Sequence, residues 1–373
     1  MRSPLLNLQQ TAYFLLTFCL LGYLLIIGQS LLSPLVFALF LTSLLIPLCR
    51  WVERWVPWRG AAILATFLLV LLPVLAVLFL FSWQFAEVVQ NIPAISGQLR
   101  AGVDQIFSWL QAQFGLSRAE GQQWLADNLS KVLDAPLAFL GKGISSSTST
   151  LLGIGLGLLY LFFFLYYRTA FRNFLLIQFR PDGRDEAKAL LGDIQRIGRG
   201  YLYGLLLVIL ILGVLNSLGL WLIGIEYPVF WGSLAACLTV IPYIGTTLGG
   251  AFPFLFALAT TNTWWQPAAV VGMYFLLQQL EGNLITPNVI GSKVRINAFA
   301  AIFSLVLGGT LWGISGMILA LPMVAVLKVT LEQFEATQPL ALLLGRNPHR
   351  HRQLFFDRFD EDRFRLLRFF RED

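Results

Sequence analysis

A short polar stretch at the end of an apolar run carries the side chains best suited to chemistry. Glu281 is the only carboxylate well inside an apolar segment, and Gln278 lies three residues before it. Residues three apart share one face of a helix, so the two side chains are predicted to form a polar face. Asn283 follows, and Pro287 is expected to interrupt the helix within two turns. Such a face beside a broken helix is suited to binding an ion or a polar solute. The structural alternative is a protonated Glu281 hydrogen-bonded between helices, or one that reaches the aqueous interface.

A proline–glycine turn supplies the second group of candidates. Pro242, Tyr243, Gly245 and Thr246 interrupt a long apolar segment. Helix ends at such a turn expose N–H and C=O groups that can bind ions, although a plain turn without a ligand explains the pattern equally well. Asn216 lies in a neighbouring apolar segment and is expected to line the same cavity.

The composition indicates the elements that must position these residues. Only 12% of the 373 residues are charged and 57% are hydrophobic, whereas soluble domains are about 25% charged. Apolar runs of roughly 20 residues recur, which is the length of a membrane-spanning helix. The sequence therefore predicts an all-α, polytopic membrane protein, whose first apolar run is a retained span and no cleaved signal. The first five spans are predicted at 11–28, 31–49, 60–83, 148–167 and 200–223.

The C-terminal half contains three further apolar segments, at 228–260, 268–290 and 298–331. The first and third are too long for one span, and glycine and proline interrupt each near its middle. Two topologies fit: six full spans plus two re-entrant helical hairpins, or eight spans. The positive-inside rule favours hairpins, because they place Lys293 and Arg295 on the cytoplasmic side. The hairpin topology also forms an inverted repeat, the arrangement that many secondary transporters use for alternating access.

Charge in the loops predicts the orientation and the organisation of the chain. The arginine-rich loops after the second and fourth spans are predicted to be cytoplasmic, together with both termini. The second of these loops is expected to contain a short amphipathic helix over 184–198. The predicted parts are 1–83, spans one to three; 84–147, an amphipathic helical insert on the outer face; 148–199, the fourth span and a cytoplasmic loop; 200–333, the transport core; and 334–373, a cytoplasmic amphipathic tail.

Several classes of function are disfavoured by the sequence. The motifs GxxxxGK[ST], HExxH and GxSxG are absent, so no enzyme and no cofactor are predicted. The two histidines, His349 and His351, lie in the basic tail without further ligands at suitable spacing, and no metal site is predicted. The net charge of +6 is concentrated in short loops and the tail, which favours lipid headgroups over nucleic acid as partners.

Three motifs resemble the signature of the autoinducer-2 exporter family of bacterial membrane proteins. They read "IPYIGTTLGGAFP", "QQLEGNLITPNVIG" and "LVLGGTLWGISGMILALPMVAVLKVTLE", within about 200–333. The matching positions are Pro242, Tyr243, Gly245, Gln278, Glu281, Gly282, Pro287, Gly313, Gly316, Met317, Ala320 and Pro322. The resemblance implies a transporter in a bacterial inner membrane, and oligomeric assembly. It also implies either export of autoinducer-2 or exchange of sodium or lithium for protons, without selecting between them.

The predicted function is therefore a secondary transporter that exports a small polar solute or exchanges Na⁺ or Li⁺ for H⁺. Its partners would be that solute or monovalent cations and protons, membrane lipids, and further copies of the chain. The alternative is a non-transporting membrane scaffold for envelope assembly, acting through the outer insert and the tail; a channel ranks third. The sequence selects no substrate, coupling ion, stoichiometry or oligomeric state.

Overall fold

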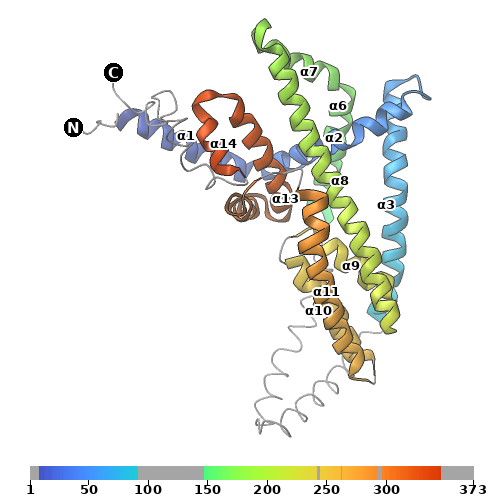
Figure 1. Cartoon of the computed structure of the whole chain (residues 1–373). Coiled ribbons are helices and arrows are strands. Elements are labelled where there is room, and N and C mark those ends of the chain that lie inside the picture. The colour runs from blue at the N-terminus through green and yellow to red at the C-terminus, as the bar shows by residue number, and fades with distance from the viewer. Residues whose placement is uncertain (1–7, 91–146, 242–243, 262, 292–295, 346–373) are drawn as a thin grey trace, which may run out of the picture. The chain divides into compact units, whose positions relative to one another are not determined.

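The protein is all-helical in the parts that the structure describes (Figure 1). An isolated antiparallel bridge between Ile296 and Gly345 is the single β contact recorded there. This computed structural model describes residues 8–90, 147–241, 244–261, 263–291 and 296–345. Most of the predicted outer insert and the amphipathic part of the tail lie outside the described residues, so both remain predictions.

The first four predicted spans are helices. They are α1 (Leu8–Ile27), α2 (Gln29–Val52), α3 (Arg59–Gln90) and α6 (Ser147–Tyr166). A short helix not predicted from the sequence, α7 (Arg168–Ile177), follows α6 and is bent from it by 69°.

The fifth span is longer than expected. After a 3-10 turn at Pro181–Gly183, a single helix, α8 (Arg184–Ile223), contains both the amphipathic segment over 184–198 and the predicted span. The predicted helix over 184–198 is therefore present and begins at the expected residue, but it does not end at 198. No proline lies inside this segment, so nothing in the backbone forces a break between the two parts.

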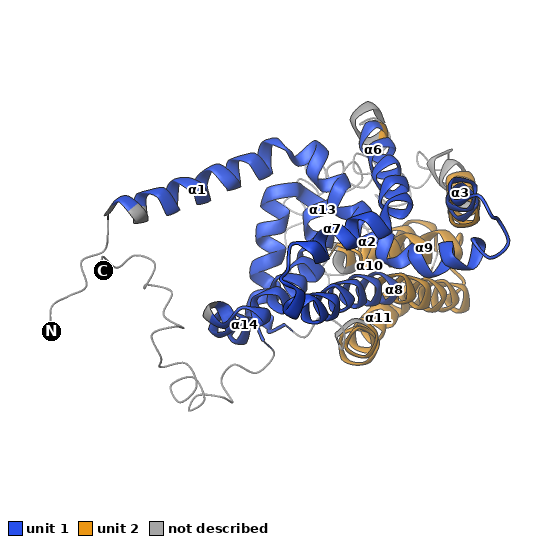
Figure 2. Ribbon diagram, turned by 90° about the horizontal axis from the view of Figure 1, so that it is seen from above, with its two compact units in different colours: residues 1–66, 152–204, 290–373 blue, residues 67–151, 205–289 orange. Residues whose placement is uncertain are grey.

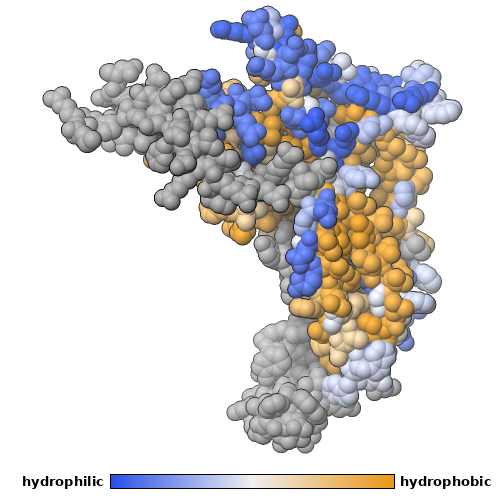
Figure 3. All heavy atoms as spheres, in the orientation of Figure 1, coloured by the Kyte–Doolittle hydropathy of each residue, from blue (hydrophilic) through white to orange (hydrophobic). Residues whose placement is uncertain are grey.

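Several of the described helices could cross a membrane. Four pass on length and composition, namely α2, α3, α8 and α13 (Ala298–Gln333), but α13 is interrupted near its middle. Helices α6 and α7 would make a fifth if that bent pair is one span. Large apolar side chains on their surfaces are exposed, and hydrophobic residues cover most of the visible surface over α3 and the lower part of α8 (Figure 3). This pattern is that of a multi-pass membrane protein, although the full number of spans remains a prediction.

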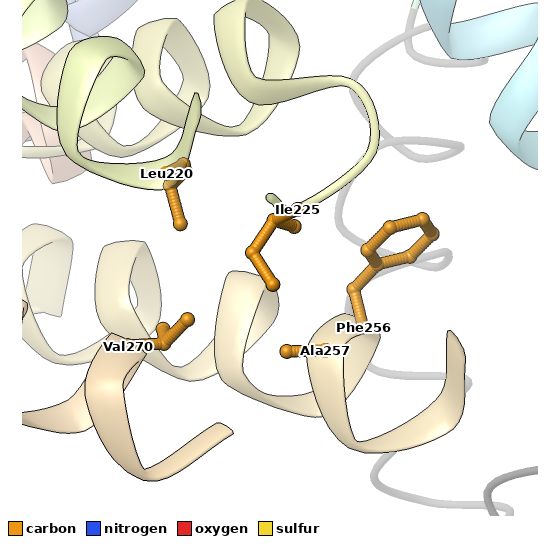
Figure 4. Close-up of a cluster of buried hydrophobic side chains, with 5 residues drawn as sticks. All are labelled: Leu220, Ile225, Phe256, Ala257 and Val270. Atoms are coloured by element: carbon orange, nitrogen blue, oxygen red, sulfur yellow. The ribbon is translucent and has the colours of Figure 1, made fainter. Parts of the chain in front are cut away.

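The chain divides into two compact units (Figure 2). Unit 1 comprises residues 1–66, 152–204 and 290–373, and unit 2 comprises residues 67–151 and 205–289. One core of unit 2 joins the end of α8 to two later helices, α10 (Ile244–Thr260) and α11 (Trp265–Leu280). Its buried side chains point toward one another in Figure 4 and are Leu220, Ile225, Phe256, Ala257 and Val270.

In unit 2, the long apolar segment 228–260 folds back on itself. Helix α9 (Pro228–Leu238) packs against α10. A Cβ placed on Gly245 would overlap the carbonyl of Leu238, and one on Gly249 would lie 3.1 Å from the Cα of Ala235. The absence of a side chain at these two glycines lets the two backbones approach closely. Helices α9 and α10 are called the first hairpin below.

In unit 1, the segment 298–331 folds back as well. Helix α13 is interrupted at Trp312 and at Gly313, whose φ of +59° is accessible chiefly to glycine. A Cβ on Gly316 would overlap the carbonyl of Gly308, although eight residues of straight helix would separate them by about 12 Å. The two parts of α13 are called the second hairpin. Whether either hairpin enters and leaves the membrane on one side stays a prediction.

Asn297, which precedes the second hairpin, forms hydrogen bonds with the end of a short C-terminal helix. The Asn297 side chain accepts a hydrogen bond from the Ala300 backbone at 2.8 Å, which caps the N-terminus of α13. The same side chain donates to the Leu343 carbonyl at 2.6 Å, and the Asn297 backbone N–H donates to the Leu344 carbonyl at 3.0 Å. Helix α14 (Gln338–Leu344) is thereby attached to the start of the second hairpin.

The bend between α6 and α7 is also fixed within unit 1. Arg168, the first residue of α7, forms an ion pair at 2.5 Å with Glu53, the C-cap of α2. The buried thiol of Cys49 lies 3.7 Å from both partners. Arg59 donates to the Leu165 carbonyl at 3.5 Å, near the end of α6. These contacts hold the start of α7 against the segment that joins α2 to α3.

Candidate functional site

One pocket in unit 2 contains most of the predicted site residues whose side chains are described. Its lining residues come from α8, from the first hairpin and from α11 with the residue that follows it. They are Leu212, Asn216, Ala235, Thr239, Gly245, Gly249, Tyr274, Leu277, Gln278 and Glu281. The space open to the centre of a water molecule is about 20 Å³, which is enough for one or two waters or a bare monatomic ion.

Helical spacing explains how these residues come together. Tyr274, Gln278 and Glu281 recur at steps of four and three residues and so lie on one stripe of α11. Leu212 and Asn216 form the corresponding pair on α8, and the other two helices contribute pairs with the same four-residue step. The pocket is therefore built from ordinary helical faces that meet at one level.

Small residues let the helices come close enough to enclose the pocket. A Cβ on Gly232 of α9 would overlap Ser217 of α8, so these two backbones are in near contact. On the other side, a Cβ on Gly250 of α10 would lie 3.3 Å from the Tyr274 ring of α11. Close helix packing of this kind is typical of membrane proteins, where small residues replace bulky core side chains.

The pocket contains polar groups that make no hydrogen bond to the described residues. The Tyr274 hydroxyl is buried without a hydrogen-bond partner among the described residues. Asn216 is only 4% exposed, and its side chain makes no hydrogen bond to the described part of the chain. Thr239 donates to the Ala236 carbonyl at 2.7 Å, which leaves its oxygen free to accept. Leaving such groups without a partner costs about 1–3 kcal/mol each, so a bound water or ion at this place would be stabilised.

Glu281 supplies the pocket's carboxylate. It is half-buried, and no ion pair among the described residues includes it. It is also the residue at which α11 ends and the backbone widens into a π turn, Glu281–Ile285, with a second such turn at Pro287–Gly291. Single π turns inside helices are frequent at functional sites. The interruption predicted at Pro287 thus begins earlier, at Glu281, and is a widening of the helix.

The predicted site residues are brought together only in part. Asn216, Gly245, Gln278 and Glu281 line the pocket. Asn283 is exposed and donates to Gln279 at 3.2 Å instead.

The remaining predicted residues contribute nothing that the structure describes at the pocket. Pro287 is exposed and begins the second π turn. Pro242 and Tyr243 lie outside the described residues, as does the side chain of Thr246.

Two polar pocket residues were not identified from the sequence. Tyr274 lies seven residues before Glu281, which is two helical turns, and extending the polar face backwards would have found it. Thr239 lies at the end of α9, and only the fold of the first hairpin brings it near α11.

Oxygen atoms dominate the polar groups of the pocket, contributed by one carboxylate, two amides, a phenol and an alcohol. Hard cations prefer such oxygen ligands, and a carboxylate can also carry a proton. The set of helices that could span a membrane defines a multi-pass membrane protein. Residues 13–336 match the model of the AI-2E family transporters. The chain belongs to this family.

Individual relatives agree with the family match. The "AI-2 transport protein TqsA" of Escherichia coli (strain K12) is 26% identical over 325 residues, which are 85% of this chain and 90% of TqsA. "Putative transport protein MT0215" of Mycobacterium tuberculosis (strain CDC 1551 / Oshkosh) is 27% identical over 326 residues, 84% of this chain and 83% of that protein. "Putative transport protein YrrI" of Bacillus subtilis (strain 168) is 36% identical over 151 residues, but these cover only 40% of this chain and 42% of YrrI.

Proposed function

We propose that this protein is an ion-coupled secondary transporter whose coupling site is the pocket around Glu281. It would export a small polar solute, such as autoinducer-2, or exchange Na⁺ or Li⁺ for H⁺. The observation that carries the proposal is the position of Glu281, because the pocket's one carboxylate lies beside the buried Tyr274 hydroxyl, which has no hydrogen-bond partner among the described residues. Membership of a transporter family supports the same class of function.

The roles of the pocket residues follow from their chemistry. Glu281 would carry either a proton or the compensating charge for a bound cation, since a lone charge among apolar helices is costly. Gln278, Asn216 and Tyr274 would supply neutral oxygen ligands that replace part of the cation's hydration shell. Because one carboxylate serves both species, cation and proton would compete for the site, and such competition is the basis of exchange.

The volume of the pocket indicates that it can hold a cation but not an organic solute. The space open to the centre of a water molecule, about 20 Å³, holds a bare cation or one or two waters and leaves no room for an organic solute. An organic solute would therefore bind in a second arrangement of the helices that is wider than this one. We expect the first hairpin to move, because its glycines let it contact α8 and α11 without interlocking side chains.

Flux in reconstituted vesicles tests this function directly. Purified protein would be given gradients of Na⁺, Li⁺ and H⁺ in turn, and autoinducer-2 would be tested as cargo. Glu281→Gln should reduce ion-coupled flux to the level of protein-free vesicles, because the amide keeps the shape of the side chain and removes its titratable charge.

A matched substitution controls for changes in folding. Glu226 is an exposed carboxylate outside the pocket, so Glu226→Gln should keep wild-type flux. Unchanged ion-coupled flux in Glu281→Gln, across a series of pH values, would reduce Glu281 to a structural residue. It would favour the scaffold alternative, whose expected interaction region, the insert within 84–147, lies largely outside the described residues.

The cellular setting belongs to the same proposal. We place the protein in the bacterial inner membrane with both termini in the cytoplasm, as the distribution of arginines in its loops indicates. The oligomeric assembly and the division into a transport core over 200–333 and flanking parts are retained as proposals.

A further inference from the structure

Helix α7 has an apolar face and a polar face, and both are largely exposed. Steps of three and four residues along α7 connect five apolar side chains, and the opposite face carries four polar ones. The apolar residues of that face are Ala170, Phe171, Phe174, Leu175 and Ile177, and the polar residues are Arg168, Thr169, Arg172 and Asn173. The sixth apolar residue, Leu176, follows Arg172 by four residues and so lies on the polar face, where it is partly buried. Phe174 and Ile177 are 63% and 68% exposed. No residue of α7 is buried, so the protein leaves this apolar face uncovered.

The orientation of α7 relative to α6 is that of a helix lying along a membrane surface. The bend between the two helices is 69° (Figure 1). If α6 crosses the bilayer near its normal, α7 is then within about 20° of the membrane plane, since the plane is perpendicular to that normal. The Arg168–Glu53 ion pair and the hydrogen bond from Arg59 to the Leu165 carbonyl hold this bend in place.

Two observations place the bend at the boundary of the membrane. Glu53 lies in a short connection that also carries Trp55 and Trp58, which are 77% and 81% exposed. Exposed tryptophans at a span end are typical of the interfacial aromatic belt. In addition, Phe171 on the apolar face of α7 contacts Phe164 of α6, with ring centroids 5.6 Å apart. The apolar face of α7 is therefore directed toward α6, on the side where the acyl chains would lie.

The charge on α7 indicates which lipids would be bound. The helix contains two arginines and no acidic residue. Arg168 is neutralised by Glu53, whereas none of the ion pairs among the described residues uses Arg172. Arg180, shortly after the helix, is exposed as well. Basic side chains beside an interfacial apolar face are complementary to anionic headgroups.

We propose that α7 is an in-plane membrane anchor, with its apolar face on the acyl chains and Arg172 on the phosphates of anionic lipids. The anchor would connect the bilayer surface to the start of α8, because only residues 178–183 separate the two helices. This inference does not depend on the identity of the cargo or on the role of Glu281.

Depth-dependent quenching in the full-length protein tests the proposal. Single cysteines would replace Phe174, Ile177 or Asn173 in a chain carrying Cys19→Ala and Cys237→Ala, while buried Cys49 is retained. Each cysteine would carry an environment-sensitive fluorophore, and the protein would be reconstituted in vesicles of phosphatidylcholine with phosphatidylglycerol. Lipids with a nitroxide high on the acyl chain should quench the probes at 174 and 177, and aqueous iodide should quench the probe at 173.

Other results would overturn the proposal. Equal quenching by iodide at the three positions would mean that α7 lies in water. Protection of positions 174 and 177 from both quenchers would mean that protein covers the apolar face, for example a second copy of the chain. Because Phe174 and Ile177 are both strongly exposed, a folding defect in one variant would not affect the reading from the other.

A charge variant tests the headgroup contact separately. Arg172→Gln should lower the ratio of docked to undocked helix about fivefold in vesicles that contain phosphatidylglycerol. The same change should have little effect in phosphatidylcholine alone. An equal effect in both lipids, or none in either, would remove anionic lipid as the partner of Arg172.

Discussion

The two helical hairpins are alike in construction but differ in how their polar neighbours are satisfied. Near the tip of the second hairpin, the Trp312 indole donates to the Leu25 carbonyl at 3.0 Å, and Thr310 donates to the Leu307 carbonyl at 2.8 Å. Beside the first hairpin, the Tyr274 hydroxyl and the Asn216 side chain have no partner among the described residues. A hairpin with internally paired neighbours is a structural device, whereas one bordered by unpaired polar groups is a candidate binding site.

Close glycine packing is the feature that the two hairpins share, and breaking it should give the largest effect. Gly316→Ala should lower the stability of the protein by about 1–3 kcal/mol, because the new Cβ would overlap the Gly308 carbonyl. Gly272→Ala is the matched control, since no atom lies within 4 Å of the Cβ position at that helical glycine. It should instead stabilise the protein by about 0.5–1 kcal/mol. Thermal unfolding in detergent measures both, and equal shifts of the same sign would contradict the packing of the second hairpin.

An intermediate effect is expected at the hydroxyl that distinguishes the first hairpin. Tyr274→Phe should weaken the binding of the coupling ion by about 10- to 100-fold, which corresponds to one lost hydrogen bond to a charged group at about 1.5–3 kcal/mol. The half-saturating ion concentration for flux measures this change. Stability should not fall, because the hydroxyl has no partner to lose among the residues that the structure describes.

The corresponding change near the second hairpin provides the comparison. Thr310→Val removes a hydroxyl that only bonds within its own helix, so the ion dependence of flux should stay at the wild-type value. If both substitutions shift the ion dependence equally, the distinction between the hairpins fails.

The smallest effect is expected at the C-terminus. Deletion after residue 345 should leave flux unchanged within error, because the described contacts of α14 are all retained. Deletion after residue 337 removes α14 and with it the partners of Asn297, so the stability of the second hairpin should fall. Flux and thermal unfolding of the two truncated proteins decide this, and a loss of flux in well-folded protein ending at 345 would give the tail a role in transport.

Much of the fold could be predicted from the sequence because single features determined it locally. The apolar runs predicted the apolar helices, and glycine with proline in segments too long for one span predicted that these segments are interrupted. The amphipathic pattern over 184–198 was identified, but its continuity with the following span was not. A change of hydrophobic pattern along a helix requires no change of backbone.

The candidate site was predictable only along one helix. Gln278 and Glu281 are related by helical spacing, so their shared face could be inferred. Thr239 joins them through the fold of the first hairpin, which local spacing does not describe. Asn283, which the sequence grouped with them, is exposed, donates to Gln279 and is not one of the residues that line the pocket. The apolar face of α7 was not predicted either, because only the arginines of its loop were used, and these predict the side of the membrane and no helix.

The reaction rate of the buried Cys49 thiol can report local opening at the C-terminal end of α2. The thiol is fully inaccessible beside Glu53 and Arg168, and alkylating reagents react only with thiols that they can reach. In a chain carrying Cys19→Ala and Cys237→Ala, modification of Cys49 must therefore await a local opening that exposes its thiol. The alkylation rate of Cys49 therefore measures how often this local opening occurs.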